Sequence, residues 1–182
     1  MGPELHTPRL DLVLMDAEEA RALAGGVSEN GHPWAAGYPL GSSLLRAELT
    51  LAAAARKLAL RGFGSYQMIR RADGHVIGDV GFMGPPDATG AVSVGCGIID
   101  DARGQGYATE AVGEILRLCF DVLGLRRVTA LCFADNIPSW RLMERLGMRR
   151  EEHNVRDSLH RSGEWLDGYG YALLAEDWRG RA

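Results

Sequence analysis

The chain has 182 residues, of which 46% are hydrophobic and 24% charged, and its formal net charge is −4. This length is typical of one domain whose core is large enough to fold without metals or disulfides. The acidic balance disfavours a duplex nucleic-acid partner, because phosphate binding needs a basic face. No apolar run approaches the ~18 residues of a membrane span, and the first residues, MGPELHTPRLDL, contain no apolar signal segment. Three cysteines without CxxC spacing are typical of reduced core residues. We therefore expect a cytoplasmic protein with no membrane partner.

The first elements are a strand and a short helix. Residues 9–15, RLDLVLM, alternate well enough to predict a strand. Asp16, with Glu19 three places on, predicts the N-terminal cap of a helix that ends at Gly25. The glycine-rich residues that follow predict a loop in which Trp34 is embedded.

A second helix and a hairpin come next. Ser42 or Ser43 predicts the cap of a helix that runs to Gly62. Residues 62–83 then predict two strands that turn at residues 72–74, where an Asp-Gly pair stands.

The best-defined segment covers residues 92–122. A strand rich in valine and isoleucine leads into a turn with two close glycines, and a helix with a clean apolar stripe follows. The stripe consists of Ala108, Ala111, Val112, Ile115, Leu118, Cys119 and Val122. Residues 126–135 predict a strand, residues 136–147 a helix, and the tail two further strands joined near Ser162. The order predicts a mixed α/β sheet in one domain, residues 1–182, with helices on its faces.

A strand that ends in a glycine turn and opens into a helix can bind an anion, because the first helical amides are free and the dipole is positive there. Three glycine motifs compete. The phosphate loop of nucleotide hydrolases needs a lysine directly after its second glycine, and none follows here; the dinucleotide fingerprint needs a glycine where Thr109 stands. The coenzyme A loop, Q/R-x-x-G-x-G/A, is matched at every fixed position by residues 103–108, RGQGYA.

The chain resembles the GNAT superfamily of acetyl-CoA-dependent N-acetyltransferases, and within it the RimJ/RimL-like group of ribosomal-protein alanine N-acetyltransferases. Five segments in the same order carry the resemblance: TPRLDL, DGHVIGDVGF, RGQGYATEAV, DNIPSWRLMERLGM and NVRDSLHRSGEWLDGYGYALLAEDW. The resemblance implies a central, mostly antiparallel mixed sheet with a splayed strand pair. It also implies acetyl-CoA as co-substrate, with no metal, and an amine as acceptor. Dimers are common in this group, so a homodimer is a further expectation.

The resemblance also implies where the co-substrate binds. The glycines let the backbone approach the pyrophosphate, and backbone groups near Ile98 and Ile99 pair with the pantetheine arm or polarise the thioester carbonyl. The implied binding residues are Ile98, Ile99, Arg103, Gly104, Gln105, Gly106, Tyr107, Ala108, Thr109 and Asn136. Asn136 has a second interpretation, as the cap of the helix that follows it.

The implied reaction is direct attack of an amine on the acetyl thioester. Many relatives place a tyrosine acid where this chain has Met143, so the RimJ/RimL-like assignment gives that role to Ser139. Ser139 can equally be a helix-cap hydroxyl.

Three residues are candidates for binding the acceptor. Asp79 falls in an interior strand, where a carboxylate needs a partner; it attracts the substrate ammonium or pairs with Arg70 or Arg71. Trp34 and Tyr38 contact the substrate or anchor their loop to the core. His153 and His160 are interpreted as surface residues.

Two alternative functions remain open. One is an acyl-CoA-binding regulatory module without turnover, which the missing tyrosine and base favour. The other is an acetyltransferase that modifies antibiotics or polyamines, which the acidic residues near the final hairpin leave open.

Overall fold

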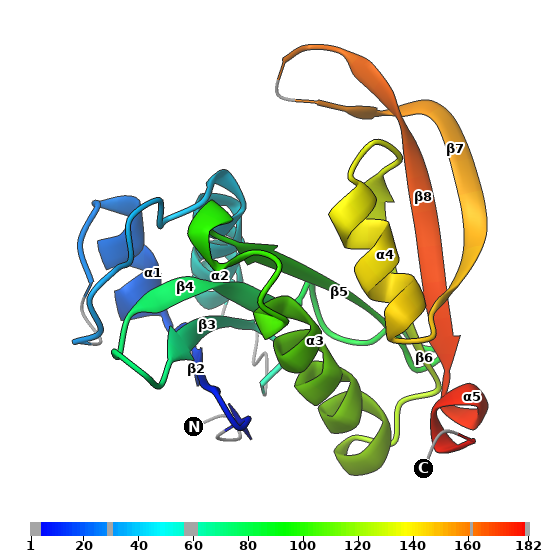
Figure 1. Ribbon diagram of the computed structural model, residues 1–182, viewed down its shortest axis with the longest axis horizontal. Helices are drawn as coiled ribbons and strands as arrows, with labels where there is room; N and C mark the ends of the chain where they lie inside the picture. Colours follow the sequence, from blue (N-terminus) through cyan, green and yellow to red (C-terminus); the bar gives the residue numbers. More distant parts are fainter. Residues whose placement is uncertain (1–4, 29–30, 57–61, 161, 181–182) are drawn as a thin grey trace. The chain divides into compact units, whose positions relative to one another are not determined.

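The computed structural model describes residues 5–28, 31–56, 62–160 and 162–180. The chain divides into two compact units, each built from two stretches of sequence. Unit 1 comprises Met1–Pro85 with Gly95–Ile115, and unit 2 comprises Pro86–Val94 with Leu116–Ala182. Figure 1 shows the course of the chain through the labelled elements. The assignment of residues 1–182 to a single domain stays a prediction.

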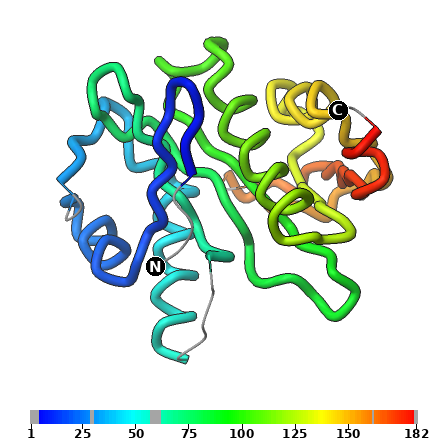
Figure 2. Tube along the Cα trace, turned by 90° about the horizontal axis from the view of Figure 1, so that it is seen from below, coloured from blue at the N-terminus to red at the C-terminus, as the bar shows by residue number. Residues whose placement is uncertain are grey.

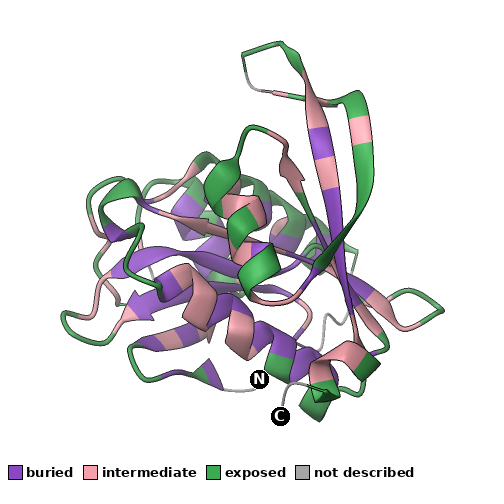
Figure 3. Cartoon of the chain, turned by 45° about the vertical axis from the view of Figure 1, so that its right-hand side comes forward, coloured by how far each residue is buried: buried purple, intermediate pink, exposed green. Residues whose placement is uncertain are grey.

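Unit 1 is built on strands that follow one another in hydrogen-bonding order. They are β1 (Leu5–His6), β2 (Leu10–Leu14), β3 (Ser65–Arg70), β4 (Val76–Phe82) and the second half of β5 (Ala91–Ile98). The pairings of β1 with β2, β2 with β3 and β3 with β4 are antiparallel. Every residue of β4 is buried, which requires cover on both faces of the sheet (Figure 3). Figure 2 shows α1 and α2 on one side of these strands and the start of α3 on the other.

The helices of unit 1 begin where local side chains satisfy their first amides. In α1 (Ala17–Ala24), the Asp16 side chain accepts from the amides of Glu18 and Glu19, so the predicted cap is confirmed. The second helix, α2 (Gly41–Ala55), begins one residue after Leu40, so the predicted serine cap is wrong. Ser43 instead lies in the first turn, where its hydroxyl accepts from the Leu40 amide. The helix ends at Ala55, and residues 57–61 of the predicted span lie outside the described residues.

A short 3₁₀ turn, η1 (Asp100–Ala102), separates β5 from the third helix, α3 (Tyr107–Arg117). Most of the predicted apolar stripe is buried, since Ala111, Ile115 and Cys119 have no exposed surface, whereas Val122 at its end is 58% exposed. A π-helical turn, η2 (Leu118–Val122), continues α3. Its five-residue hydrogen bond runs from the Leu123 amide to the Leu118 carbonyl, and the sequence pattern did not predict it.

Unit 2 contains the start of β5 with β6 (Arg127–Phe133), β8 (Trp165–Leu174) and β7 (Arg149–Leu159), in that hydrogen-bonding order. β8 is antiparallel to both of its neighbours, whereas β5 and β6 are parallel. The β5–β6 ladder has three pairs and ends at Ser93 opposite Thr129, as a splayed pair requires. The predicted mixed, mostly antiparallel sheet is confirmed.

Two helices complete unit 2. The fourth helix, α4 (Ile137–Arg145), matches the prediction, whereas α5 (Ala175–Arg179) was not predicted. Trp178 of α5 stacks on Phe120 with 5.7 Å between ring centroids and donates to Asp121 at 2.8 Å. This contact holds α5 against the π-helical turn. The β7 side of the hairpin is mainly exposed (Figure 3). No helix within the described ranges is long and apolar enough to cross a membrane.

Candidate active site

The predicted anion-binding loop lies in unit 1, between η1 and α3. Gly104 and Gly106 have φ values of 73° and 85°, a left-handed conformation that favours glycine. A Cβ added at Gly104 would meet no atom within 4 Å, so the space beside this backbone is open. The first amides of α3, at Tyr107 and Ala108, have no carbonyl one turn earlier to bond. At Gly106 an added Cβ would lie 3.2 Å from Arg9 Nη2, so this glycine is closely packed. Anion binding by the loop stays a prediction.

Arg9 ties this loop to the sheet. Its Nη1 donates to the Gln105 carbonyl at 2.9 Å, its Nε donates to Glu110 at 2.7 Å, and its guanidinium lies 4.4 Å from the Tyr107 ring centroid. Glu110 also accepts from the hydroxyl of Thr7 and the amide of Arg9. Burial raises the pKa of Glu110, but these hydrogen bonds outweigh burial and lower its pKa overall. The carboxylate in the first turn of α3 is thus neutralised by Arg9.

The sequence analysis missed Arg9 and Glu110. A carboxylate in the helical turn that faces a pyrophosphate would repel it unless a cation neutralised it. The sequence could therefore have indicated that Glu110 needs a cationic partner, but it could not identify Arg9 as that partner. Arg103, the predicted cation of the loop, is exposed and lies 3.0 Å from Asp100.

The end of β5 differs in part from the prediction. The Ile99 amide donates to the Ile77 carbonyl at 3.0 Å, and the Ile99 carbonyl accepts from Ala102. The Ile99 N–H is therefore used within unit 1, and a contact of Ile99 with the co-substrate stays a prediction. Because alternate residues of a strand direct their amides to opposite edges, the Ile98 amide points away from β4.

Asp79 lies at the centre of a buried polar network. It has no exposed surface, and its two oxygens accept from the hydroxyls of Tyr38 (2.8 Å) and Ser43. Gln67 bridges the Tyr38 hydroxyl to Glu19, at 3.2 and 2.9 Å. Burial raises the pKa of Asp79 above its usual range, against the opposing hydrogen bonds. Burial likewise raises the pKa of Tyr38.

The network changes the interpretation of Asp79. Arg70 and Arg71, its predicted partners, pair with Asp73 and Asp11 instead. The cation that acts on Asp79 is Arg46 of α2. The Asp79 carboxylate is fully buried and hydrogen-bonded to Tyr38 and Ser43. Direct attraction of a substrate ammonium by Asp79 stays a prediction.

The aromatic loop packs on β4. Trp34 forms a parallel bridge with Val76, and its ring meets that of Tyr38 edge-on with 5.6 Å between centroids. Tyr38 is 7% exposed, which fits the loop-anchoring alternative, whereas Trp34 remains partly exposed. A Cβ at Gly37 would lie 3.7 Å from Ile99, so this loop approaches the end of β5. Trp34 is thus the residue of the pair with surface available to an acceptor.

Unit 2 holds Asn136 and Ser139 at the start of α4. The Asn136 side chain accepts from the Ser139 amide at 3.3 Å, so Asn136 is the cap of this helix. The Ser139 hydroxyl is therefore not needed as a cap. The Ser139 hydroxyl hydrogen-bonds the Cys132 thiol. Burial raises the pKa of this thiol, and the hydrogen bond offsets part of that rise. Met143, at the position where relatives carry a tyrosine, is buried.

Comparison with known proteins identifies the family of this chain. A family model for the acetyltransferase (GNAT) domain matches residues 9–149. The chain belongs to the GNAT family. An uncharacterized N-acetyltransferase of Bacillus subtilis (strain 168), YnaD, is 42% identical over 76 residues, which are 42% of this chain and 44% of YnaD. The match therefore spans less than half the length of this relative.

Solved GNAT structures share the fold over nearly the whole chain. A putative ribosomal-protein-serine acetyltransferase from Vibrio cholerae is 25% identical, with a TM-score of 0.68 over 96% of this chain and 99% of that one. A chimera of spermidine N-acetyltransferase SpeG from Vibrio cholerae and hSSAT is 16% identical, with a TM-score of 0.73 over 95% and 99%. The second similarity concerns the fold alone. Within the described residues, no group of three or more His, Cys, Asp or Glu side chains is placed to hold a metal ion.

Proposed function

We propose that this protein transfers the acetyl group of acetyl-CoA to a primary amine, either the α-amine of a protein N-terminus or a small-molecule amine. The observation that carries the proposal is the open loop of residues 103–108, with its two left-handed glycines at the start of α3. The chain belongs to a family that uses acetyl-CoA as co-substrate.

In this proposal the loop binds the pyrophosphate. Arg103 contributes a positive charge, and the amides from Gly104 to Ala108 contribute donors. Arg9 supports the site because it fixes the Gln105 carbonyl and neutralises Glu110. Asn136, besides capping α4, contributes its amide group to the pantetheine arm.

Bound acetyl-CoA supplies an acyl thioester whose carbonyl carbon is open to attack by an amine. The Ile98 amide, which points away from β4, donates to the carbonyl oxygen and stabilises the charge that develops there. Ser139 Oγ donates a hydrogen bond to the departing sulfur. A weak donor suffices, because the pKa of a thiol is only about 8.5.

The acceptor must lose a proton before it attacks. An α-amine has a pKa of about 7.7–8.0 and a side-chain amine of about 10.4, so the α-amine costs roughly 3–4 kcal/mol less to deprotonate. A site without a strong base therefore favours an α-amine. We assign acceptor contact to the partly exposed Trp34, with Tyr38 and Asp79 holding its loop in place.

The test is release of free thiol from acetyl-CoA with a panel of acceptors. The panel contains peptides with N-terminal alanine or serine, the same peptides with a blocked N-terminus and a free lysine, spermidine, and an aminoglycoside. Release that depends on a free α-amine supports the N-terminal acceptor, and release with spermidine or the aminoglycoside supports the small-molecule acceptor. Coenzyme A binding without release for any acceptor would contradict transfer and support the regulatory module. The homodimer stays a prediction, which light scattering tests.

A further inference from the structure

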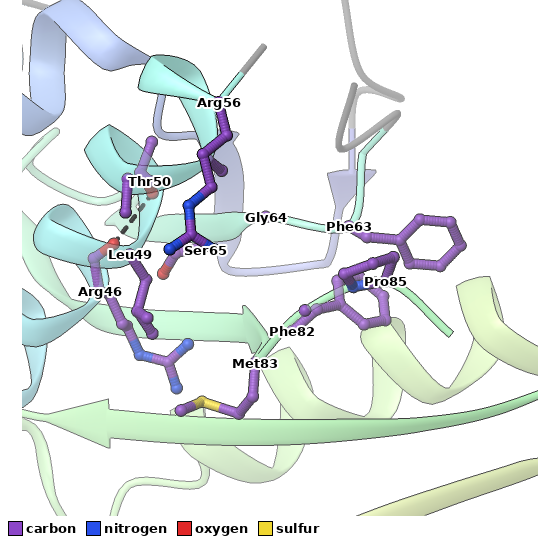
Figure 4. A pocket seen from close by; sticks show the side chains of 13 residues that line it. Arg46, Leu49, Thr50, Arg56, Phe63, Gly64, Ser65, Phe82, Met83 and Pro85 are labelled. Carbon is purple, nitrogen blue, oxygen red and sulfur yellow. Dashed lines mark hydrogen bonds between the residues drawn. The ribbon is translucent and has the colours of Figure 1, made fainter. Parts of the chain in front are cut away.

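A pocket in unit 1 is lined by two arginines and two phenylalanines. It lies between the C-terminal half of α2, the start of β3 and the end of β4, and its volume is about 190 Å³. Its lining includes Arg46, Arg56 and Ser65 together with Phe63 and Phe82 (Figure 4). None of these residues belongs to the loop of residues 103–108, and of the residues named here only Arg46 also interacts with Asp79.

Two buried polar atoms of this pocket lack a hydrogen-bond partner. Arg46 is 6% exposed and Ser65 is 3% exposed. Within the described ranges, Arg46 Nη1 and Ser65 Oγ are buried without a partner. Buried polar groups are nearly always bonded, and an unpaired buried charge costs several kcal/mol. Two orphaned donors on the wall of one cavity indicate a missing acceptor.

Arg46 interacts electrostatically with Asp79. The hydrogen bonds to the two Asp79 oxygens come from Tyr38 and Ser43. The guanidinium packs closely against β5, since a Cβ at Gly95 would lie 2.7 Å from Nη2. The guanidinium therefore packs against Gly95 of β5 through Nη2, while Nη1 has no hydrogen-bond partner.

The pocket has a cationic side and an apolar side. Figure 4 shows the Arg56 side chain extending toward Ser65 and the Arg46 guanidinium pointing toward Met83, so both guanidinium groups lie on the α2 side of the pocket. Phe63 and Phe82 lie on the other side, edge to face, with 5.1 Å between ring centroids. No acidic side chain is among the described residues that line the pocket. The lining thus matches an anion with an apolar body.

We propose that this pocket binds a small carboxylate with an apolar body, whose oxygens accept from Arg46 Nη1 and Ser65 Oγ and whose body packs on Phe63 and Phe82. The volume is that of about six water molecules and lies below the ~300 Å³ typical of drug-sized sites. A ligand of the size of benzoate fits this limit. The proposal does not depend on acetyl transfer.

The test is an NMR titration of isotope-labelled protein with benzoate, benzamide and acetate. Saturating coenzyme A is present, so that the carboxylate does not compete for the loop of residues 103–108. Benzamide has the same shape without the charge, and acetate has the charge without the apolar body. We expect benzoate to bind at least tenfold more tightly than either, with the shift changes centred on the Arg46 and Ser65 amides. Equal affinity of benzoate and benzamide, or shift changes elsewhere in the chain, would overturn the proposal.

Variants separate this site from non-specific binding. Arg46→Met keeps the apolar stem and is expected to weaken benzoate binding tenfold to a hundredfold, the usual range for a hydrogen bond to a charged group. Arg21→Met, which removes an exposed arginine of α1, is the matched control and leaves the affinity unchanged. Ser65→Ala, a smaller change, is expected to weaken binding about twofold to tenfold without loss of fold. Affinities in Arg46→Met and Ser65→Ala equal to that of the control would refute the site, as would a crystal soaked in benzoate that shows only water on Arg46 Nη1 and Ser65 Oγ.

Discussion

Replacing Gly78 by alanine would place a methyl group between β4 and β5, at the strand end that leads into the proposed thioester site. The added Cβ would lie 2.2 Å from the Gly97 carbonyl oxygen, 2.5 Å from Met68 Cε and 2.9 Å from Ile98 Cα. The methionine methyl can rotate away. The two backbone atoms move only if the strands separate, so we expect a loss of stability and a displaced Ile98.

The magnitude follows from two opposing effects. Overpacking a close contact costs typically 1–3 kcal/mol. Replacing glycine by alanine gains about 0.4–1 kcal/mol, because the unfolded chain loses freedom. The clash is larger because it involves backbone on both sides. For a chain of this size each kcal/mol changes the melting temperature by about 2–4 °C. We therefore expect Gly78→Ala to melt about 2–10 °C below the parent protein, with a smaller stabilisation by coenzyme A.

The assay is thermal unfolding with and without coenzyme A, and Gly180→Ala is its matched control. Gly180 has an ordinary φ of −71°, and a Cβ there would come no closer than 3.7 Å to any atom. The control is expected to melt at or slightly above the parent temperature. Equal melting temperatures and equal coenzyme A shifts for the two variants would show that β4 and β5 have room for the methyl group.

Three further outcomes are expected. Gly106→Val removes most of the roughly 2.7 kcal/mol that coenzyme A adds at 100 times its dissociation constant. Gly163→Val, at a left-handed glycine where an added Cβ meets no atom within 4 Å, retains that gain in melting experiments, whereas a Cβ at Gly106 would lie 3.2 Å from Arg9 Nη2. Ser139→Ala lowers kcat by about a hundredfold or more at an unchanged melting temperature, because the Asn136 side chain caps α4; an unchanged kcat would remove Ser139 from the mechanism. Burial raises the pKa of Asp79, so the folded state binds more protons than the unfolded one, and stability falls as the pH rises above about 4. The melting temperature of Asp79→Asn minus that of the parent protein should therefore rise between pH 4 and pH 8. A difference that stays constant with pH would contradict a raised pKa of Asp79.

Elements with local signals were predictable from the sequence. The stripe from Ala108 to Val122 repeats every three to four residues and predicts α3 whatever the helix packs against. Gly104 and Gly106 mark a left-handed turn, which both glycines adopt. Asp16 caps α1 with amides two and three residues away. In each case the stabilising contacts lie within one or two turns of the residue that signals them.

The buried network had no such signal. Asp79 bonds Tyr38 and Ser43, which lie 41 and 36 residues earlier in the chain. The predicted partner Arg70 bonds Asp73 instead, three residues away, because a partner in the same turn is easily reached. The serine cap of α2 was wrong for the same reason, since the Ser43 hydroxyl serves Asp79. Sequence patterns thus located the glycine loop, for which co-substrate binding stays a proposal, and did not identify the hydrogen-bond partners of Asp79.

The interleaved composition of the two units has a consequence for synthesis on the ribosome. Unit 1 needs Gly95–Ile115, and these residues are made after Pro86–Val94, which belong to unit 2. The nascent chain therefore holds β2, β3 and β4 without β5 until residues 91–98 have emerged, and unit 1 is complete only when the glycine loop and α3 as far as Ile115 have followed. Unit 2 waits longer, because β6 gains its antiparallel partner only when β8 is made. Among the strands of the described residues, β5 alone contributes to both units. Its emergence is therefore the step on which the order of cotranslational folding depends.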